Sequence, residues 1–307
     1  MQAPSIGVIG GGLMGAGIAT RFALAGIETI LIEANAQRIT QIRAIVDDTL
    51  SELIDADICT PTQRQQVHQA LSVSSDLTVL ATTSAVIEAI PEDLAIKQDL
   101  YAQLESLLPS NALIISNTSG FLPDLLCEKM QHQQRFLIAH FWNPPHLIPL
   151  VEVVPATATT PDVIEQTIAL LRQIQAEPVL LTKAIPGFIG NRLQFALLRE
   201  ALHIIQSGAA DAATVDAVMT ASLGRRYSIM GPLESADLGG LRTMLQVGTH
   251  LVPQLASDAQ CLALLHKMVD QDNLGASSGR GFHVWDAERI ASVGARRRAL
   301  LRRQRIG

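Results

Sequence analysis

The sequence predicts an α/β protein in which a doubly wound sheet is followed by an all-helical C-terminal domain. Up to about residue 184, short apolar runs typical of buried parallel strands alternate with helical patterns. Beyond the break at Ile185-Pro186-Gly187 only helical patterns follow, and a length of 307 residues suits two domains. We therefore expect a sheet domain over residues 1–184 and a helical domain over residues 185–307.

The first element is the apolar strand SIGVIG, which begins at Ser5 and runs into a glycine-rich turn. Gly10, Gly12 and Gly15 form the pattern G-x-G-x-x-G between this strand and a helical stretch, and the strand after the helix ends in Glu33. In this context the glycines let the backbone approach a pyrophosphate at the helix N-terminus, and the acid binds ribose hydroxyls. The pattern predicts a Rossmann-type dinucleotide site, with a purely structural glycine turn as the alternative.

The acid at the end of the second strand also indicates which dinucleotide binds. Glu33 would repel a 2′-phosphate, so NAD is favoured over NADP. Arg38 lies close by in the sequence and would suit a 2′-phosphate, which keeps NADP as the alternative. The residues expected to hold the cofactor in this segment are Gly10, Gly12, Leu13, Met14, Gly15, Glu33 and Arg38.

Two further strands are predicted over residues 85–90 and 112–117. The helix between them is expected to open at Pro91-Glu92 and contains Lys97. The polar segment Asn117-Thr118-Ser119-Gly120 follows at the end of the second strand. Open α/β sheets bind ligands beyond the carboxyl ends of their strands. Ser119 is therefore a candidate ligand residue, although a helix cap without chemistry would look the same.

The stretch RFLIAHFWNPPHLIPLVEVVP contains two apolar strands, 135–141 and 150–154, joined by a proline-rich connection. His140 lies at the end of the first strand and Glu152 inside the second. A carboxylate within such a strand is rarely buried without a partner, and a carboxylate can fix the tautomer of an imidazole. His140 and Glu152 are therefore predicted to pair. The alternative is that His140 caps a strand and Glu152 faces solvent.

The other predicted elements are helices, apart from one short strand. They are a helical excursion over residues 37–71 broken at Thr60-Pro61, a helix over 161–175, a strand over 178–182, and helices over 188–207, 212–223, 233–255 and 259–271.

Composition excludes several classes of protein. Hydrophobic residues make up 48% and charged residues 17%, which is a globular composition, and a net charge of −6 argues against general nucleic-acid binding. Three widely spaced cysteines offer no metal-binding pattern and favour a reducing compartment. No apolar run is long enough to span a membrane, and the chain enters its first strand without a cleavable leader pattern. We therefore expect a cytoplasmic protein.

The arginine-rich C-terminal end is most simply a solvated helix face or a frayed tail. Its arginines are Arg296, Arg297, Arg298, Arg302, Arg303 and Arg305.

Taken together, these motifs resemble the L-3-hydroxyacyl-CoA dehydrogenase superfamily over nearly the full length of the chain. The segments that carry the resemblance are IGVIGGGLMGAGIA, VIEAIPEDLAIK, SNTSG, AHFWNPPHLIPLVEV, PGFIGNR and GPLESADLGGL. The helical half, with LGRRYSIMGPLE, is more similar to the branch of L-gulonate 3-dehydrogenase and lambda-crystallin.

This resemblance implies roles for individual residues. His140 would be the general base and Glu152 its orienting partner, while Ser119 and Asn191 would flank the reacting oxygen and Asn143 would support the site. Glu92, Lys97 and Asn117 would join the cofactor residues towards the nicotinamide end. The implied enzyme oxidises an (S)-3-hydroxyacyl compound, expected to be a 3-hydroxyacyl-CoA of fatty acid metabolism, with NAD.

Two departures from the acyl-CoA enzymes keep a second substrate class open. The helical excursion lacks the lysines that bind the phosphates of CoA in the family, and offers only Arg64 and His68 between residues 49 and 77. Arg225 and Arg226 replace a mainly uncharged stretch, and Arg226 could bind a free carboxylate. The alternatives are a dehydrogenase of a free polar 3-hydroxy acid of the gulonate or carnitine type, and a non-catalytic NAD-binding protein like the crystallins.

The helical half is also expected to mediate a two-fold homodimer. Its apolar residues exceed what the core of a small unit requires, and surplus apolar surface usually marks association. The residues on which this expectation depends are Phe188, Leu193, Phe195, Leu197, Leu198, Ile204 and Ile205.

Overall fold

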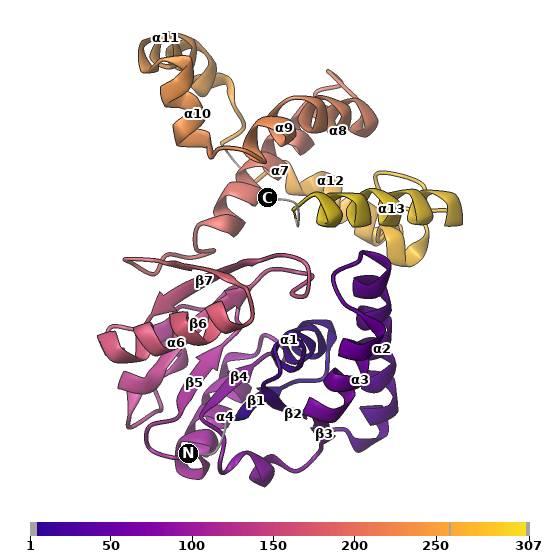
Figure 1. The fold of residues 1–307 in the computed structure, drawn as a ribbon. Helices are drawn as coiled ribbons and strands as arrows, with labels where there is room; N and C mark the ends of the chain where they lie inside the picture. Colours follow the sequence, from indigo (N-terminus) through magenta and orange to yellow (C-terminus); the bar gives the residue numbers. More distant parts are fainter. Residues whose placement is uncertain (1–4, 258, 305–307) are drawn as a thin grey trace. The chain divides into compact units, whose positions relative to one another are not determined.

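The computed structural model describes residues 5–257 and 259–304, with side chains described up to residue 299. The chain divides into two compact units, one of Met1–Phe188 with Arg297–Gly307 and one of Ile189–Arg296 (Figure 1). Each unit is described by itself below. The predicted fold class, a doubly wound sheet followed by a helical region, is confirmed.

In the described part of the first unit, eight strands form one sheet in the order β3-β2-β1-β4-β5-β6-β7-β8. Strand β7 is antiparallel to β6 and parallel to β8, and the other neighbouring strands are parallel. The chain leaves β1 first towards β2 and β3 and then, from β4, in the opposite direction. The strands are β1 (Ser5–Ile9), β2 (Glu28–Ile32), β3 (Leu71–Ser74), β4 (Ala85–Glu88), β5 (Leu113–Ser116), β6 (Phe136–Phe141), β7 (Leu150–Pro155) and β8 (Glu177–Leu180).

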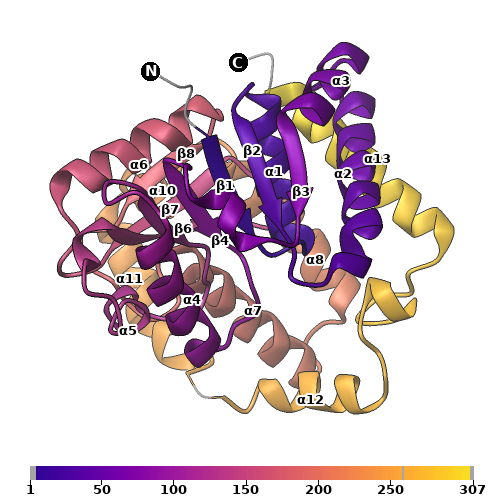
Figure 2. The ribbon, with the colours of Figure 1, turned by 90° about the horizontal axis from the view of Figure 1, so that it is seen from below.

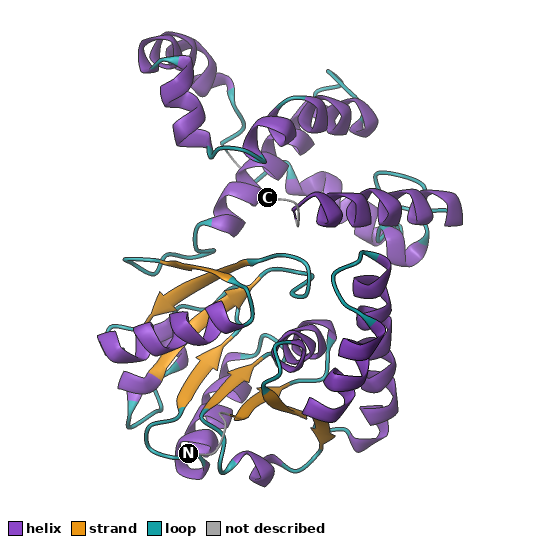
Figure 3. Cartoon of the chain, viewed as in Figure 1, coloured by secondary structure: helices purple, strands orange, loops and turns teal. Residues whose placement is uncertain are grey.

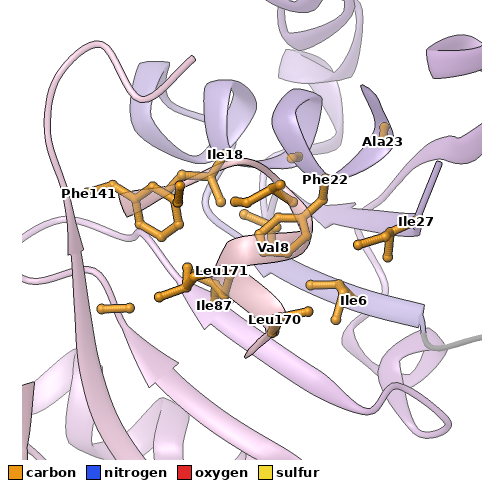
Figure 4. Close-up of a cluster of buried hydrophobic side chains, with 14 of the residues drawn as sticks. Ile6, Val8, Ile18, Phe22, Ala23, Ile27, Ile87, Phe141, Leu170 and Leu171 are labelled. Atoms are coloured by element: carbon orange, nitrogen blue, oxygen red, sulfur yellow. The ribbon is translucent and has the colours of Figure 1, made fainter. Parts of the chain in front are cut away.

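Helices cover both faces of this sheet, and Figure 2 shows α4 and α6 on opposite sides of the strands. The core on one face includes Phe22 and Phe141 (Figure 4), and the core on the other includes Tyr101 and Phe136. Because successive strand residues point to opposite faces, Phe141 joins the first core while its neighbour His140 points to the second. The helices are α1 (Leu13–Leu24), α2 (Ile39–Asp55), α3 (Pro61–Ala70), α4 (Leu94–Leu107), α5 (Pro123–Leu126) and α6 (Pro161–Gln173).

Local capping explains where several of these helices begin. Thr60 and Gln63 form a capping box in front of α3, whose first residue is Pro61, as the break in the helical excursion predicts. Helix α4 begins at Leu94 instead of the expected Pro91-Glu92, because the Asp93 side chain accepts a hydrogen bond from Ile96 N–H and caps it there. Strand β3 was not predicted, since its four residues have no strong apolar pattern.

The described part of the second unit contains helices and no strand longer than an isolated bridge (Figure 3). The single helix expected over residues 233–255 is wrong. Gly240, at φ +87°, separates α10 from α11, a conformation that side chains other than glycine rarely adopt. The helices are α7 (Gly190–Gln206), α8 (Ala212–Ala221), α9 (Leu223–Tyr227), α10 (Pro232–Gly239), α11 (Leu241–Leu251) and α12 (Leu262–Asp270).

The arginine-rich end forms the helix α13 (Ala287–Gln304), whose residues from Arg297 onwards belong to the first unit. Arg305 and the side chains of Arg302 and Arg303 lie outside the described residues. Within the described residues, no helix is both long enough and apolar enough to cross a membrane.

Candidate active site

The sheet register brings the ends of five strands together at one edge. Ile9, Glu88, Ser116 and Ile138 are successive partners across β1, β4, β5 and β6, and Ile32 of β2 pairs with Ile9 on the other side. The segments that follow this row are the glycine turn, Glu33, the loop before α4, Asn117–Gly120 and His140. The chain reverses its direction across the sheet between β1 and β4, and such switch points are where α/β sheets bind ligands.

The glycine turn after β1 fits the pyrophosphate of a dinucleotide. Gly10 has φ +109°, and a Cβ on Gly15 would lie 1.8 Å from the carbonyl oxygen of Gly10, so neither position accepts a side chain. A Cβ on Gly12 would meet open space in front of α1, whose N-terminus has no side-chain cap. Leu13 and Met14 begin that helix, so their amides lie where an anion would be stabilised.

Glu33 lies beside this turn with its carboxylate already held. Its Oε2 accepts hydrogen bonds from Gly11 N–H at 3.2 Å and from Arg38 Nη1 at 3.1 Å, and its Oε1 accepts one from Asn35 N–H at 3.1 Å. Arg38 is therefore an ion-pair partner of Glu33. These contacts fix the acid next to the glycine turn, where it can accept hydrogen bonds from ribose hydroxyls.

The segment after β5 is held by Glu92, from the loop before α4. Glu92 Oε1 accepts hydrogen bonds from Ser119 N–H at 2.7 Å and Thr118 Oγ1 at 2.7 Å, and lies 3.3 Å from Ser119 Oγ. Burial raises the pKa of Glu92, but the hydrogen bonds from Ser119 and Thr118 and the ammonium of Lys97 outweigh it and hold that pKa below its ordinary value. Glu92 thus fixes the turn after β5 that contains Thr118 and Ser119.

His140 and Glu152 are direct partners across the antiparallel strands β6 and β7. Nδ1 of His140 lies 3.0 Å from Oε2 of Glu152, and the residues are only 6% and 2% exposed. Both residues lie within paired strands and are buried, so the alternative, in which His140 caps a strand and Glu152 faces solvent, is wrong. An ionised carboxylate only accepts hydrogen bonds, so beside such a group an imidazole carries its proton on Nδ1, and the neutral ring keeps a lone pair on Nε2.

Aromatic side chains surround this pair. The rings of Trp142 and Phe188 lie 5.9 and 5.4 Å from that of His140, and Trp142 Nε1 donates to Glu152 Oε2 at 3.4 Å. Asn117 fixes the strand end, because its Oδ1 accepts a hydrogen bond from Phe141 N–H at 2.8 Å. Asn143 is exposed and precedes the cis peptide bond to Pro144.

A fully buried polar cluster lies behind the edge, and the sequence analysis missed most of it. Glu88, at the end of β4, accepts hydrogen bonds from Lys97 Nζ at 2.6 Å, Ser116 Oγ at 2.8 Å and the hydroxyl of Tyr101. Lys97 also pairs with Glu92 at 3.3 Å. The signals available were an acid closing the apolar strand AVIE, and Lys97 and Tyr101 one helical turn apart.

Two predicted site residues lie in the second unit. Asn191 stands in the first turn of α7. Arg226 is exposed on the short helix α9, where its Nη1 lies 3.5 Å from Ser235 Oγ. Among the described residues, Arg226 has no acidic partner.

Comparisons with known proteins identify the family. The model of the 3-hydroxyacyl-CoA dehydrogenase NAD binding domain matches residues 5–185, and that of the 3-hydroxyacyl-CoA dehydrogenase C-terminal domain matches residues 187–285. The chain is 31% identical to a 3-hydroxybutyryl-CoA dehydrogenase of Mycobacterium tuberculosis, over 91% of this chain and 98% of that protein. It is 32% identical to lambda-crystallin of Oryctolagus cuniculus, over 78% and 76%.

The chain is also similar to 5-formyl-3-hydroxy-2-methylpyridine 4-carboxylate 5-dehydrogenase. It is 28% identical to the enzyme of Mesorhizobium japonicum, over 95% of this chain and 94% of the enzyme. A solved structure of a dehydrogenase of this name, an NAD⁺-dependent dismutase, superposes with a TM-score of 0.88 at 27% identity, covering 99% of this chain and 98% of the other. From the two family models and these relatives, the chain belongs to the 3-hydroxyacyl-CoA dehydrogenase family, and it is an NAD-dependent oxidoreductase acting on CH–OH groups.

Proposed function

We propose that His140 is the general base that removes the hydroxyl proton from a secondary alcohol. The 3.0 Å contact between His140 and Glu152 carries this proposal. It holds the proton on Nδ1, so that Nε2 accepts the substrate proton, and Glu152 stabilises the imidazolium that results. Bound NAD supplies the acceptor for the hydride. In the reverse direction the imidazolium returns the proton to the oxygen of the carbonyl.

Ser119 and Asn191 are assigned to the reacting oxygen and Asn143 to the support of the site. For Ser119 the support is geometric, because Glu92 fixes the turn that carries it at the edge where β5 and β6 end. For Asn191 and Asn143 the support is the family motif. Hydrogen bonds from fixed side chains position the oxygen and stabilise its developing charge.

For the substrate we propose a small hydroxy compound with a free carboxylate. The observation that favours such a substrate is that Arg64 and His68, in the helical excursion, already have an acidic partner. Arg64 Nη2 lies 2.6 Å and His68 Nε2 3.2 Å from the same acid, Asp47, so neither is left to neutralise the phosphates of a CoA nucleotide. Arg226, without an acidic partner among the described residues, could bind a carboxylate in a bidentate manner. The pyridine compound named for a relative of nearly equal length also carries a free carboxylate, although its group at position 5 is an aldehyde and not a secondary alcohol.

A short (S)-3-hydroxyacyl-CoA is the second candidate. It is supported by the match to both family models and by the similarity to a 3-hydroxybutyryl-CoA dehydrogenase over almost its whole length. This candidate would give the protein a role in fatty acid metabolism.

One assay panel separates these possibilities. Acetoacetyl-CoA with NADH, and L-gulonate, carnitine and other free 3-hydroxy acids with NAD, are measured beside the His140→Gln variant. Turnover that His140→Gln abolishes supports the proposal, and the substrate class is given by which compounds react. An enzyme that binds NAD but turns over no compound of the panel would support the non-catalytic, crystallin-like alternative.

We further propose that the protein is a cytoplasmic homodimer. Of the residues on which this expectation depends, Phe188 is buried at 1% exposure, so it does not belong to an exposed face, whereas Leu193, Phe195 and Leu197 are 52%, 58% and 47% exposed. The helices α10 and α11 expose further large apolar side chains, among them Leu233, Leu238, Leu241 and Leu245 at 81%, 77%, 62% and 71%. Exposed apolar surface of this extent usually marks association, and a second copy of the same chain is the commonest partner. The three cysteines are buried free thiols, which fits a reducing compartment.

A further inference from the structure

The carboxylate of Glu88 is the centre of the buried cluster. Its Oε1 accepts hydrogen bonds from Lys97 Nζ at 2.6 Å and Ile90 N–H at 2.8 Å, and its Oε2 accepts those of Ser116 at 2.8 Å and Tyr101. Four polar groups therefore surround its two oxygens, and the hydroxyl of Tyr101 also lies 2.9 Å from Ser116 Oγ. The side chains of Glu88, Lys97, Tyr101 and Ser116 are at most 1% exposed.

The ammonium of Lys97 contacts three oxygens. It donates hydrogen bonds to Glu88 Oε1 at 2.6 Å and to the carbonyl oxygen of Ile90 at 3.2 Å, and it forms an ion pair with Glu92 Oε2 at 3.3 Å. The ammonium therefore joins a buried acid to an acid that is 42% exposed at the edge of the sheet. Lys97 is thus placed to act through Glu92.

Two routes connect Glu88 to the turn after β5. In one, Lys97 fixes Glu92, which accepts the hydrogen bond of Ser119 N–H at 2.7 Å. In the other, Ser116 donates to Glu88 and accepts a hydrogen bond from Thr118 N–H at 3.2 Å. Both routes end on neighbouring backbone amides of the same turn, those of Ser119 and Thr118, so one buried side chain holds the turn from two sides.

We propose that Glu88 is a positioning residue for Ser119: its buried carboxylate, through Lys97 with Glu92 and through Ser116, fixes the turn that presents Ser119 to the substrate oxygen. The inference rests on the proposed role of Ser119 in catalysis. If the cluster served stability alone, its loss would lower activity by the same factor whether or not Ser119 has its hydroxyl.

The test combines two readouts. Glu88→Gln replaces the buried carboxylate by an amide of similar size. Tyr101→Phe removes only the phenol hydroxyl and keeps the ring, so it remains as a test if Glu88→Gln does not fold. Amide hydrogen exchange of the segment 117–121 is followed without substrate, with the strand segment 5–9 as an internal control. A double-mutant cycle on kcat/KM is then measured with the wild-type residue and with alanine at position 119.

We expect exchange at Ser119 to be about fivefold faster in Tyr101→Phe, since a weakened hydrogen bond changes opening by about this factor. We expect kcat/KM to fall by a similar factor when Ser119 is present and by less than about twofold in the Ser119→Ala background. Unchanged exchange at Ser119, or equal factors in both backgrounds, would overturn the inference. If exchange rises but Ser119→Ala leaves kcat/KM unchanged, Glu88 holds the turn as inferred, and it is the proposed role of Ser119 that fails.

Discussion

His140 and Glu152 face each other as a register pair across β6 and β7, with Nδ1 of the imidazole 3.0 Å from the carboxylate. A cross-strand pair in an antiparallel ladder has its side chains on the same face and within contact distance. The register of the two paired strands therefore sets the orientation of the ring towards the carboxylate. This arrangement suits the imidazole to act as a general base in a fixed orientation, and substitutions at both residues can test that role.

The first prediction concerns His140 itself. His140→Gln should lower kcat by about 10²–10⁴-fold, because proton removal by a positioned base contributes about that much. The dissociation constant of NAD should change little, since the imidazole acts on substrate. Glu152→Gln should also lower kcat, because an amide cannot stabilise the imidazolium. His132→Gln, at an exposed histidine outside the site, is the matched control. A His140→Gln enzyme that retains more than about a third of wild-type turnover would exclude the role.

The second prediction concerns the cofactor. Glu33→Ala should weaken NAD binding by about 10-fold or more, because charge-assisted hydrogen bonds to the ribose would be lost. NADP binding should weaken less or improve, since Arg38 is released from its 3.1 Å ion pair and a repelling charge is removed. Titration of both cofactors by fluorescence gives the two constants. Glu28→Ala, at the exposed other end of β2, is the control. An equal loss for both cofactors would mean that Glu33 does not select between them.

Sequence reasoning anticipated the sheet, the glycine turn and the pairing of His140 with Glu152, because each leaves a local signal. Buried strands appear as short runs of apolar residues, and the glycine turn appears as glycines at the spacing G-x-G-x-x-G. An acid inside a buried strand needs a partner, which pointed to His140. The cluster of Glu88, Tyr101 and Ser116 was not anticipated, since its members come from three elements whose register only the fold defines. The break at Gly240 was missed because the apolar pattern continues through it.

The third prediction concerns the dimer. Leu238→Glu combined with Leu245→Glu should convert the protein from a dimer to a monomer at micromolar concentration, because it places charges on the exposed apolar face of α10 and α11. Light scattering reports the mass directly. Ile96→Glu, at a residue of α4 that is 58% exposed, introduces the same change elsewhere and should leave the dimer intact. A wild-type protein that is monomeric under these conditions would contradict the proposal.

The fourth prediction concerns pH and stability. His146 lies in the loop between β6 and β7, 3.1 Å from Glu52, which also pairs with Arg297 of α13 at 3.4 Å. Burial lowers the pKa of His146 below 6.5; Arg297 and Arg21 act in the same direction, and Glu52 opposes them. As the pH falls through 6.5, the unfolded chain binds a proton that the folded protein does not bind, so stability decreases.

Urea unfolding at about pH 7.5 and about pH 5.5 measures this effect. The loss of stability between the two should be smaller in His146→Asn than in the wild type. His132→Asn, an exposed histidine, should behave like the wild type. Equal losses in His146→Asn and the wild type would show that this histidine does not contribute.

The last prediction concerns Arg226 and decides between the two substrate classes. If its guanidinium binds a substrate carboxylate, Arg226→Lys should raise KM for a free hydroxy acid by about 10-fold or more, because an ammonium cannot reproduce the bidentate contact. The KM of a short acyl-CoA thioester should barely change, since it presents no carboxylate at that position. Arg225→Lys, the exposed neighbour on α9, is the matched control, because a cation near a helix C-terminus has a general stabilising role there. Suppose that both variants leave KM within about twofold for every compound that is turned over, a difference below about 0.5 kcal/mol. Arg226 is then a surface residue, and the case against an acyl-CoA substrate depends only on Arg64 and His68, which are both paired with Asp47.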